Sequence, residues 1–348
     1  MIRAWFLAVA FAALSALPSL AQQEPDHAAI AERLVSQIAL PASAALAEEA
    51  RALRDAAPAA CSNIDAAALR AQFNATWDAW MAIQHLRFGP LEDQDRALQL
   101  AFWPDSRGIV GRTVERLAKA EDPVVDDPET FAGSSVAGRG FYAMERLLYD
   151  DAGPVDLVDP YRCRHIAAVA GDILRLAGEI QVEWQDPWAT LVRTAGEADN
   201  AVFLAPEEVT ARVFATTLGA VEETAALRLG KPLGTFERRR SRLAEARRSG
   251  RSLRQIELVV DAVDLLGREV FSPDLDQASR ELLTLAVARC RDALAAVAEL
   301  GDLPKAIDGN AIRVEVLMQS VGGLANALRG SVGAGMGLVE GFNSADGD

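Results

Sequence analysis

Residues 30–53 read "IAERLVSQIALPASAALAEEARAL", and their apolar side chains recur at intervals of three, four and seven positions. That spacing follows the period of an amphipathic α-helix, whereas a half-buried strand alternates at every second residue. The stretch decides the fold class, because patterns of the same period account for most of the remaining chain. It predicts a long helix with one apolar face.

The same period extends outward from this stretch. It predicts helices over Ala66–Leu86, Val110–Ala120, Val136–Tyr149, His165–Val182, Glu208–Leu227, Leu253–Leu266, Gln277–Leu300 and Ala311–Leu328. Turns rich in proline, glycine and aspartate separate these segments, and alternating strand patterns of useful length are absent. We therefore expect an all-α chain of roughly ten helices that pack as bundles.

Serines mark two of the expected helix starts. Ser272 precedes Pro273, and Ser252 with Gln255 has the spacing of a capping box after Gly250. A serine hydroxyl in this position accepts a hydrogen bond from a free backbone N–H of the first turn. Both helices are therefore expected to begin with serine caps.

Two helix endings resemble each other. The stretches "AWMAIQHLRFGPLED" (79–93) and "LGAVEETAALRLGKPLG" (218–234) share Leu-Arg-apolar-Gly, with Pro-Leu at or near the turn. Glycine suits a helix C-terminus and the following proline stops the helix. Such a stop is common, but the shared Leu-Arg favours an internal duplication with a boundary near residues 195–206. We expect an N-terminal bundle at 22–200 and a C-terminal bundle at 201–348.

The first residues have the composition of a secretory signal peptide. Arg3 supplies a positive start, Ala4–Leu17 is apolar, and "SLA" before Gln22 fits the small residues of a cleavage site. We expect cleavage after Ala21 and an exported protein, without the cysteine that a lipid anchor needs. No later apolar stretch approaches the ~20 residues of a membrane-spanning helix, so no membrane span is expected.

The formal net charge of the chain is −15. Nucleic acids and anionic membrane surfaces bind positive patches, so this charge disfavours both as partners. It is compatible with cationic ligands, metal ions among them.

The chain has three cysteines, so one thiol is left over if two of them pair. Export permits a disulfide, and the absence of a C-x-x-C pair excludes zinc-ribbon and thioredoxin-type sites. Cys61 and Cys163 lie near expected helix starts, where chain ends can meet, and we expect them to pair. Cys290 lies within a helix and is expected to be a buried thiol.

Several catalytic patterns are missing from the sequence. It contains no HExxH helix and no GxSxG elbow, and His27, His85 and His165 are far apart along the chain. A catalytic zinc site uses two or three neighbouring imidazoles. Each histidine is therefore expected to be a surface or core residue.

The segment "GRGFYAMERLLYD" (138–150) carries the best candidate site residue. Phe141, Met144, Leu147 and Leu148 form the apolar face of its helix, and Glu145 falls at the border of that face. A partly buried carboxylate there needs a partner, which a phenol, an arginine or a metal ion could provide. The pattern alone favours an edge glutamate.

The sequence also resembles a known family. The segments that carry the resemblance are "LRFGPLED" (86–93), "FWPDSRG" (102–108), "SSVAGRGFYAMERLLYD" (134–150), "RRSGRSLRQIELV" (247–259) and "GFNSADGD" (341–348). In this order they are similar to the imelysin-like proteins of bacterial envelopes, which include insulin-cleaving imelysin, iron-regulated proteins and a periplasmic iron-uptake component. The resemblance covers nearly all of the mature chain. It implies two packed four-helix bundles and a periplasmic location.

The family's signature is G-x-H-x-x-E, and this chain departs from it at one position. Gly140 and Glu145 match its ends, but Tyr142 replaces the histidine. A phenol has a pKa of about 10 and must lose its proton to bind a divalent metal well, whereas ferric iron accepts phenolate and carboxylate oxygens. We predict Glu145 and Tyr142 as ligands of iron or another metal ion, or a metal-free site in which Glu145 pairs with arginine.

Further candidates are expected to line a polar groove between the two bundles. Arg87 ends the first of the two similar helices, and Trp103 and Asp105 belong to the turn "FWPDSRG". Arg248 and Arg251 flank the turn "RSGRS" in an arginine-rich stretch, whose simplest role is a solvated helix face. Guanidinium groups bind carboxylates and other anions through paired hydrogen bonds. We predict that these five residues contribute to one ligand site.

The C-terminal tail "SVGAGMGLVEGFNSADGD" is rich in glycine, but no strand precedes it, which excludes a dinucleotide-binding loop or a P-loop. Asn343, Asp346 and Asp348 could offer oxygen ligands. An ordinary disordered terminus is the simpler expectation.

The resemblance implies an exported binding or accessory protein linked to iron uptake. Its expected partners are a metal ion or a small anionic or cationic ligand, and envelope iron-transport proteins. Two alternatives stay open. A metallopeptidase would need a metal-activated water and a general base, which the missing histidine disfavours. The other alternative is a protein-interaction bundle with a degenerate site.

Overall fold

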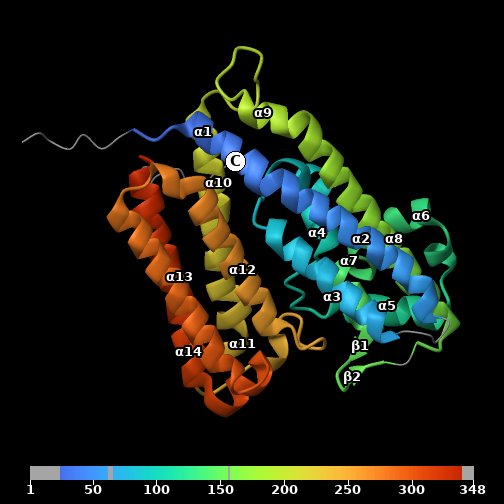
Figure 1. Cartoon of the computed structure of the whole chain (residues 1–348). Coiled ribbons are helices and arrows are strands. Elements are labelled where there is room, and N and C mark those ends of the chain that lie inside the picture. The colour runs from blue at the N-terminus through green and yellow to red at the C-terminus, as the bar shows by residue number, and fades with distance from the viewer. Residues whose placement is uncertain (1–23, 62–65, 156, 339–348) are drawn as a thin grey trace, which may run out of the picture.

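The computed structural model describes residues 24–61, 66–155 and 157–338, which are predominantly helical (Figure 1). The predicted signal peptide and the tail residues Asn343, Asp346 and Asp348 lie outside the described residues. The long helices are α2 (Leu40–Cys61), α3 (Ala66–Ile83), α8 (Pro160–Glu183), α10 (Pro206–Glu223), α12 (Ser252–Leu266), α13 (Gln277–Ala298) and α14 (Leu303–Ala327). The shorter helices are α1 (His27–Arg33), α4 (Arg96–Leu100), α5 (Ile109–Ala120), α6 (Pro128–Ala132), α7 (Gly140–Leu148), α9 (Ala189–Arg193) and α11 (Lys231–Leu233).

The strand content of the described chain is one hairpin, in which β1 (Tyr149–Asp150) pairs with β2 (Gly153–Pro154). The all-α prediction is therefore confirmed. None of the helices in the described ranges is long and apolar enough to cross a bilayer.

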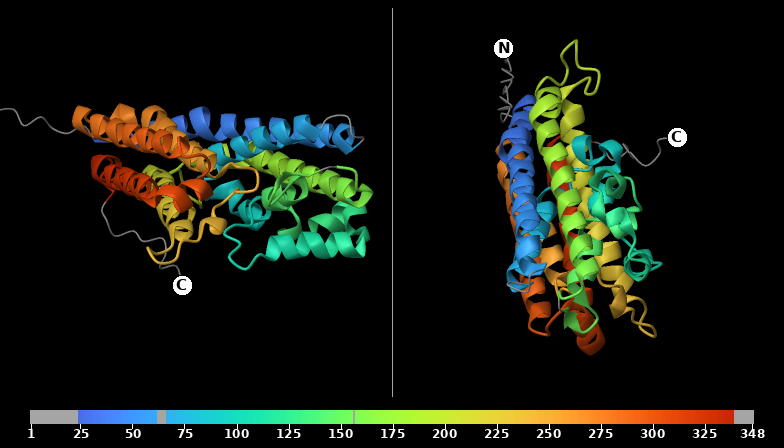
Figure 2. Two further views of the ribbon diagram at one scale, coloured as in Figure 1. Left: turned by 90° about the horizontal axis from the view of Figure 1, so that it is seen from below. Right: turned by 90° about the vertical axis from the view of Figure 1, so that its right-hand side faces the viewer.

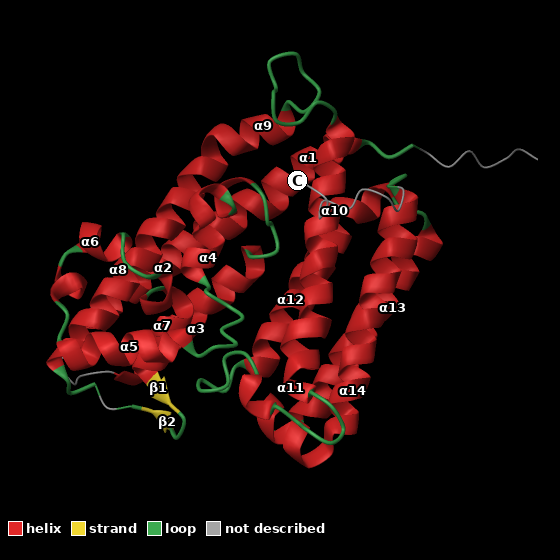
Figure 3. Ribbon diagram, turned by 180° about the vertical axis from the view of Figure 1, so that it is seen from behind, coloured by secondary structure: helices red, strands yellow, loops and turns green. Residues whose placement is uncertain are grey.

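The helices form two bundles that lie side by side (Figure 1, Figure 3). In the first bundle α2 packs against α3 and α8, and α7 packs against α8. In the second, α13 packs against α12 and α14, and α10 packs against both α12 and α14. An internal duplication of the two bundles stays a prediction.

Packing between helices joins the bundles. Helix α3 of the first packs along α12 of the second, and α1 packs on α10. Helix α1 continues through the π-helical turn Leu34–Ala39 into α2, so one long rod spans both bundles (Figure 1, Figure 2). The N-terminal residues that we assigned to the first bundle thus also cover the second.

Both predicted serine caps are wrong. Ser272 lies in a short 3-10 turn, and α13 begins later, after Asp276. Ser252 is already inside α12, and its hydroxyl donates to the carbonyl of Glu245. Helix α12 has no side-chain cap, and α13 is capped by an aspartate. Aspartates cap six helical elements of the described chain, at Asp26, Asp122, Asp127, Asp159, Asp276 and Asp302. A carboxylate accepts the free N–H groups and also interacts favourably with the positive end of the helix dipole.

The predicted disulfide is confirmed. Cys61 at the end of α2 is bonded to Cys163 in the first turns of α8, with the two Cα atoms 5.5 Å apart. The bond therefore joins two helices of the first bundle. Cys290 is a buried free thiol, as expected, and burial raises its pKa to about 11.

Candidate functional site

The signature residues lie on α7, which is buried on nearly every side. Its first residue, Gly140, has a φ of 68°, and a Cβ atom there would lie 2.3 Å from the carbonyl oxygen of Leu100. Glycine tolerates both the positive φ and the close approach. The helix predicted over Val136–Tyr149 is therefore wrong at its start, because the chain is extended at Arg139 and the α-helix begins at Gly140.

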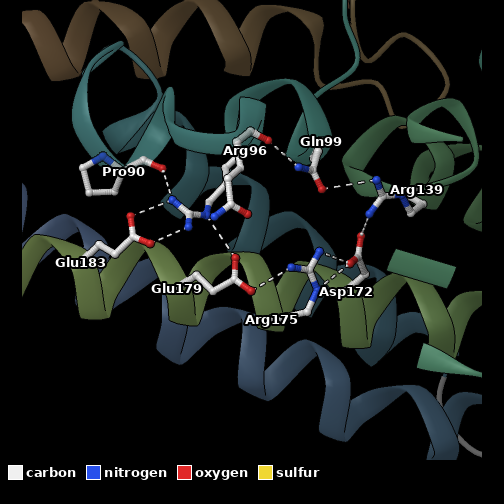
Figure 4. A network of polar contacts seen from close by, with 9 residues as sticks. Pro90, Arg96, Gln99, Arg139, Asp172, Arg175, Glu179 and Glu183 are labelled. Carbon is white, nitrogen blue, oxygen red and sulfur yellow. Dashed lines mark hydrogen bonds and ion pairs between the residues drawn. The ribbon is translucent and has the colours of Figure 1, made fainter. Parts of the chain in front are cut away.

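A network of ion pairs holds the start of α7 against α8 (Figure 4). Its labelled members are Pro90, Arg96, Gln99, Arg139, Asp172, Arg175, Glu179 and Glu183. Arg139, next to Gly140, donates to Asp172 of α8 at 3.0 Å, and both side chains are buried. Arg96, the first residue of α4, forms paired bonds of 2.7 and 2.5 Å to Glu183 at the end of α8. The buried pair of Arg139 and Asp172 is costly to break, so it fixes where α7 begins, whereas the bonds of Arg96 hold α4 against α8.

Aromatic packing sets the position of Tyr142 on α7. Its ring meets the ring of Trp77 on α3 edge to face, with centroids 5.3 Å apart. Trp77 also stacks on Phe141 at 5.7 Å. The phenol hydroxyl then reaches out of the first bundle and donates to Oε1 of Glu245, which precedes α12. Tyr142 therefore joins the two bundles.

The other oxygen of Glu245 is paired within the second bundle. Arg228, in the π-helical turn Thr224–Gly230, donates through Nε to Oε2 of Glu245 at 2.6 Å. Its Nη1 donates to Glu223 at 2.9 Å, and its guanidinium lies 4.9 Å from the centre of the Trp103 ring. Trp103 comes from the first bundle, so the cation also lies at the contact between the bundles.

Glu145 is buried, with 3% of its surface exposed, and is not an edge residue. Its Oε1 accepts hydrogen bonds from the backbone N–H and the hydroxyl of Ser249, at 3.0 and 2.8 Å. Burial raises the pKa of Glu145, although the bonds from Ser249 and the charges of Arg248 and Arg247 oppose the shift. We call the residues joined by these contacts the junction: Trp103, Tyr142, Glu145, Arg228, Glu245 and Ser249.

The junction does not hold its oxygens open for a resident metal ion. Burial raises the pKa of Tyr142 well above its ordinary value, and the charge of Glu245 raises it further, so the phenol keeps its proton. The acids are already bonded to Ser249, Tyr142 and Arg228. Within the described ranges no group of three or more His, Cys, Asp or Glu side chains is placed to hold a metal ion. The residues do not fit a preformed zinc site.

Comparison with known proteins gives a family match. The family model for imelysin matches residues 39–331. The chain belongs to the imelysin family.

Two solved structures share its fold. One is an imelysin-like protein from Psychrobacter arcticum 273-4, with a TM-score of 0.74 and 20% identity over 90% of this chain and 98% of that one. The other is named as an iron-regulated protein A precursor, from Parabacteroides distasonis ATCC 8503, with a TM-score of 0.70 and 16% identity over 90% of this chain and 96% of that one. No curated protein sequence matches the chain. At these identities the two structures support the imelysin-type fold.

The structure brings some of the predicted residues together within this fold. Tyr142, Glu145 and Trp103 belong to the junction. Arg248 lies beside it and contacts Asp151 at 3.0 Å. Arg251 pairs with Asp78 of α3 across the bundle contact.

Two predicted residues make other contacts. Arg87 is 40% exposed, donates to the carbonyl of Gln84 at 3.0 Å and lies 3.9 Å from Glu92. Asp105 accepts hydrogen bonds from two backbone N–H groups at the start of α5, at 2.7 and 2.8 Å, and so acts as a helix cap. Their contacts are local and structural, and their role in a ligand site stays a prediction.

Two surface hollows of the described chain lie away from the junction. One, of about 420 Å³, lies between α13 and α14, and the other, of about 490 Å³, lies beside the end of α5. In the junction the polar side chains pair with one another. The polar groove stays a prediction.

Sequence reasoning missed Arg228, Glu245 and Ser249. Glu245 and Ser249 come from the segment between α11 and α12, which has no helical period that would place them. The resemblance between the two helix endings could have indicated Arg228, because Arg228 occupies the position equivalent to Arg87. Of these two arginines, the buried one reaches the junction.

Proposed function

We propose that this chain is an exported, periplasmic accessory protein of iron uptake that receives ferric iron as cargo at the junction. The observation that carries the proposal is the pair of buried acids, Glu145 and Glu245, which come from different bundles and both lie close to Tyr142. Carboxylate and phenolate oxygens are hard donors that suit ferric iron. The signal-peptide pattern, the family and a structural neighbour named for iron regulation support the same role.

Binding would exchange contacts that the chain now makes with itself. Ferric iron would replace the proton of Tyr142 and the hydrogen bonds from Ser249 to Glu145. Arg228 would remain beside Glu245 and offset part of the acidic charge. Because the phenol must lose its proton, we expect binding to release a proton and to weaken as the pH falls.

We do not propose peptidase activity, the alternative that the family name raises. A metal-activated water needs a cation held by ligands that are ready to bind it. Tyr142 stands in place of the signature histidine, and its phenol is protonated and bonded to Glu245. Chelator-sensitive cleavage of an unfolded protein substrate would overturn this choice.

The proposal is tested by metal analysis and thermal shift with ferric, ferrous and zinc ions. We expect the wild type to retain ferric iron through gel filtration and to gain thermal stability, because ligands that bind the folded state stabilise it. Glu145→Gln should lose both effects. The control is Glu257→Gln, which changes an exposed acid of α12 that pairs with Arg254. No shift in the wild type, or an equal shift in Glu145→Gln, would rule out the junction as the cargo site.

A further inference from the structure

A second charged cluster lies beside the junction, where the turn between β1 and β2 meets the segment before α12. Asp151 in that turn is half-exposed, at 51%, whereas Arg146, Arg247 and Arg248 are exposed by 22%, 17% and 21%. Arg247 donates to Oδ1 of Asp151 at 2.8 Å, and Nε of Arg248 lies 3.0 Å from the same oxygen. Arg146 approaches it to 4.0 Å. Three guanidinium groups from both bundles thus converge on one carboxylate oxygen.

One oxygen is a poor match for three guanidinium groups. Each guanidinium presents a planar fork that pairs best with two oxygens. Burial lowers the pKa of Arg248, and the like charges of Arg146 and Arg247 lower it further, although the charges of Glu145 and Asp151 oppose the shift. The other nearby acids do not resolve this. Glu115 is 72% exposed and contacts Arg146 at 3.1 Å, and buried Glu145 is bonded to Ser249.

The fold also makes room for one of these arginines. A Cβ atom at Gly111 of α5 would lie 2.6 Å from Nη2 of Arg146. Gly111 is within a helix and has no unusual φ, so alanine is suited to its backbone. The glycine therefore leaves the space that the Arg146 guanidinium occupies.

We propose that Arg146, Arg247 and Arg248 form a binding site for a small polycarboxylate, and that Asp151 is an internal occupant that the ligand displaces. A carboxylate already lies where the three cations converge, so the chain itself shows which group the site accepts. A ligand with several carboxylates can pair each fork, which Asp151 cannot do. The site is outside the junction, and the inference does not depend on iron binding.

The test is isothermal titration of the metal-free, full-length mature protein with citrate, and in parallel with phosphate and sulfate. We expect citrate to bind and Arg247→Gln to weaken the affinity at least about tenfold, which is ~1.4 kcal/mol. Asp151→Asn should tighten citrate binding about threefold, because it removes the competing carboxylate. Arg291→Gln is the matched control, since Arg291 is a half-exposed arginine of α13 that is paired with Asp261 and Asp264 of α12, and it should leave the affinity unchanged.

A further variant tests the position of the Arg146 guanidinium without changing any charge. Gly111→Ala keeps every charge, favours the helix and displaces the guanidinium of Arg146, so we expect weaker citrate binding in a protein of undiminished stability. The proposal is overturned if citrate binds neither the wild type nor Asp151→Asn, or if Arg291→Gln weakens binding as much as Arg247→Gln. Tighter binding of phosphate or sulfate than of citrate would overturn the assignment to polycarboxylates.

Discussion

Gly140 places the signature helix, and its replacement should show this directly. A Cβ atom at φ 68° costs ~1–2 kcal/mol, and here it would also meet the carbonyl oxygens of Gln99 and Leu100 at 2.5 and 2.3 Å. We predict that Gly140→Ala lowers the free energy of unfolding by about 3 kcal/mol or more. The measurement is denaturant unfolding. Gly178→Ala is the control, because this α8 glycine has open space around it and alanine should stabilise the helix by ~0.5–1 kcal/mol. Equal stabilities of Gly140→Ala and the wild type would refute the geometric argument.

His85 should make the protein sensitive to mild acid. Burial lowers its pKa to about 4, and neither ring nitrogen has a hydrogen-bond partner in the described chain. In the unfolded chain its pKa is ~6.5, so between pH 6.5 and 4 the unfolded state binds more protons. His85 therefore contributes its full share to the free energy of unfolding above pH 6.5. This contribution, about 3 kcal/mol, is lost as the pH falls towards 4.

The prediction for His85 is measured by unfolding at a series of pH values. His85→Leu should flatten the loss of stability between pH 6.5 and 4 without a penalty at pH 7. Part of the slope should remain, because burial also lowers the pKa of His165. His27→Gln, at a half-buried position, serves as the control and should keep the full slope. An unchanged slope in His85→Leu would show that this histidine is not buried in its neutral form.

At the same scale, the sequence identifies site residues only where a motif or a local period marks them. Gly140, Tyr142 and Glu145 follow from the signature. The partners Glu245 and Ser249 do not, because their pairing with α7 spans about 100 residues and depends on how the bundles meet. The prediction that Glu145 lies at the edge of the apolar face was wrong for a related reason. The helical period reports one buried face, whereas α7 is covered by neighbours on several sides.

Among the elements, the long amphipathic helices were the most predictable. The prediction for Ala66–Leu86 differs from α3 by three residues at one end, and that for Gln277–Leu300 differs from α13 by two. The predicted helix ends are wrong where the local backbone conformation determines where the helix stops. The helix that contains Leu227 passes through a π-helical turn and α11 and ends before Gly234, whose φ is 61°. Its Gly230 is helical, so the expected stop comes later than the sequence pattern indicates.

The disulfide between α2 and α8 should stabilise the first bundle. It closes a loop of 102 residues, and loops of about this length give up to ~4.7 kcal/mol in the chain-entropy model, with 2–5 kcal/mol lost in typical removals. We predict a loss of this order for Cys61→Ser with Cys163→Ser, measured by thermal unfolding. Unreduced peptides without a 61–163 link, or an equally stable double variant, would contradict the role given to the bond.

Cys290, with its raised pKa, should resist alkylation in the native protein at pH 8.

Across the whole molecule, the junction is where the two bundles share buried charge. Tyr142 and Glu145 from one bundle meet Glu245 and Ser249 from the other. Every partner is supplied by the chain itself, so a cargo ion would have to compete with contacts that also hold the bundles together. This arrangement links binding at the junction to the contact between the bundles.

Visible absorption during titration with ferric iron, supplied as a weak chelate, tests this account most directly. Iron bound to a phenolate absorbs visible light through charge transfer, and the chain has three tyrosines in all. We predict that the band appears in the wild type and in Tyr161→Phe, a tyrosine bonded to the carbonyl of Asp122 away from the junction, and is lost in Tyr142→Phe. No band in the wild type, or a band that persists in Tyr142→Phe, would contradict the claim that the junction binds ferric iron through Tyr142.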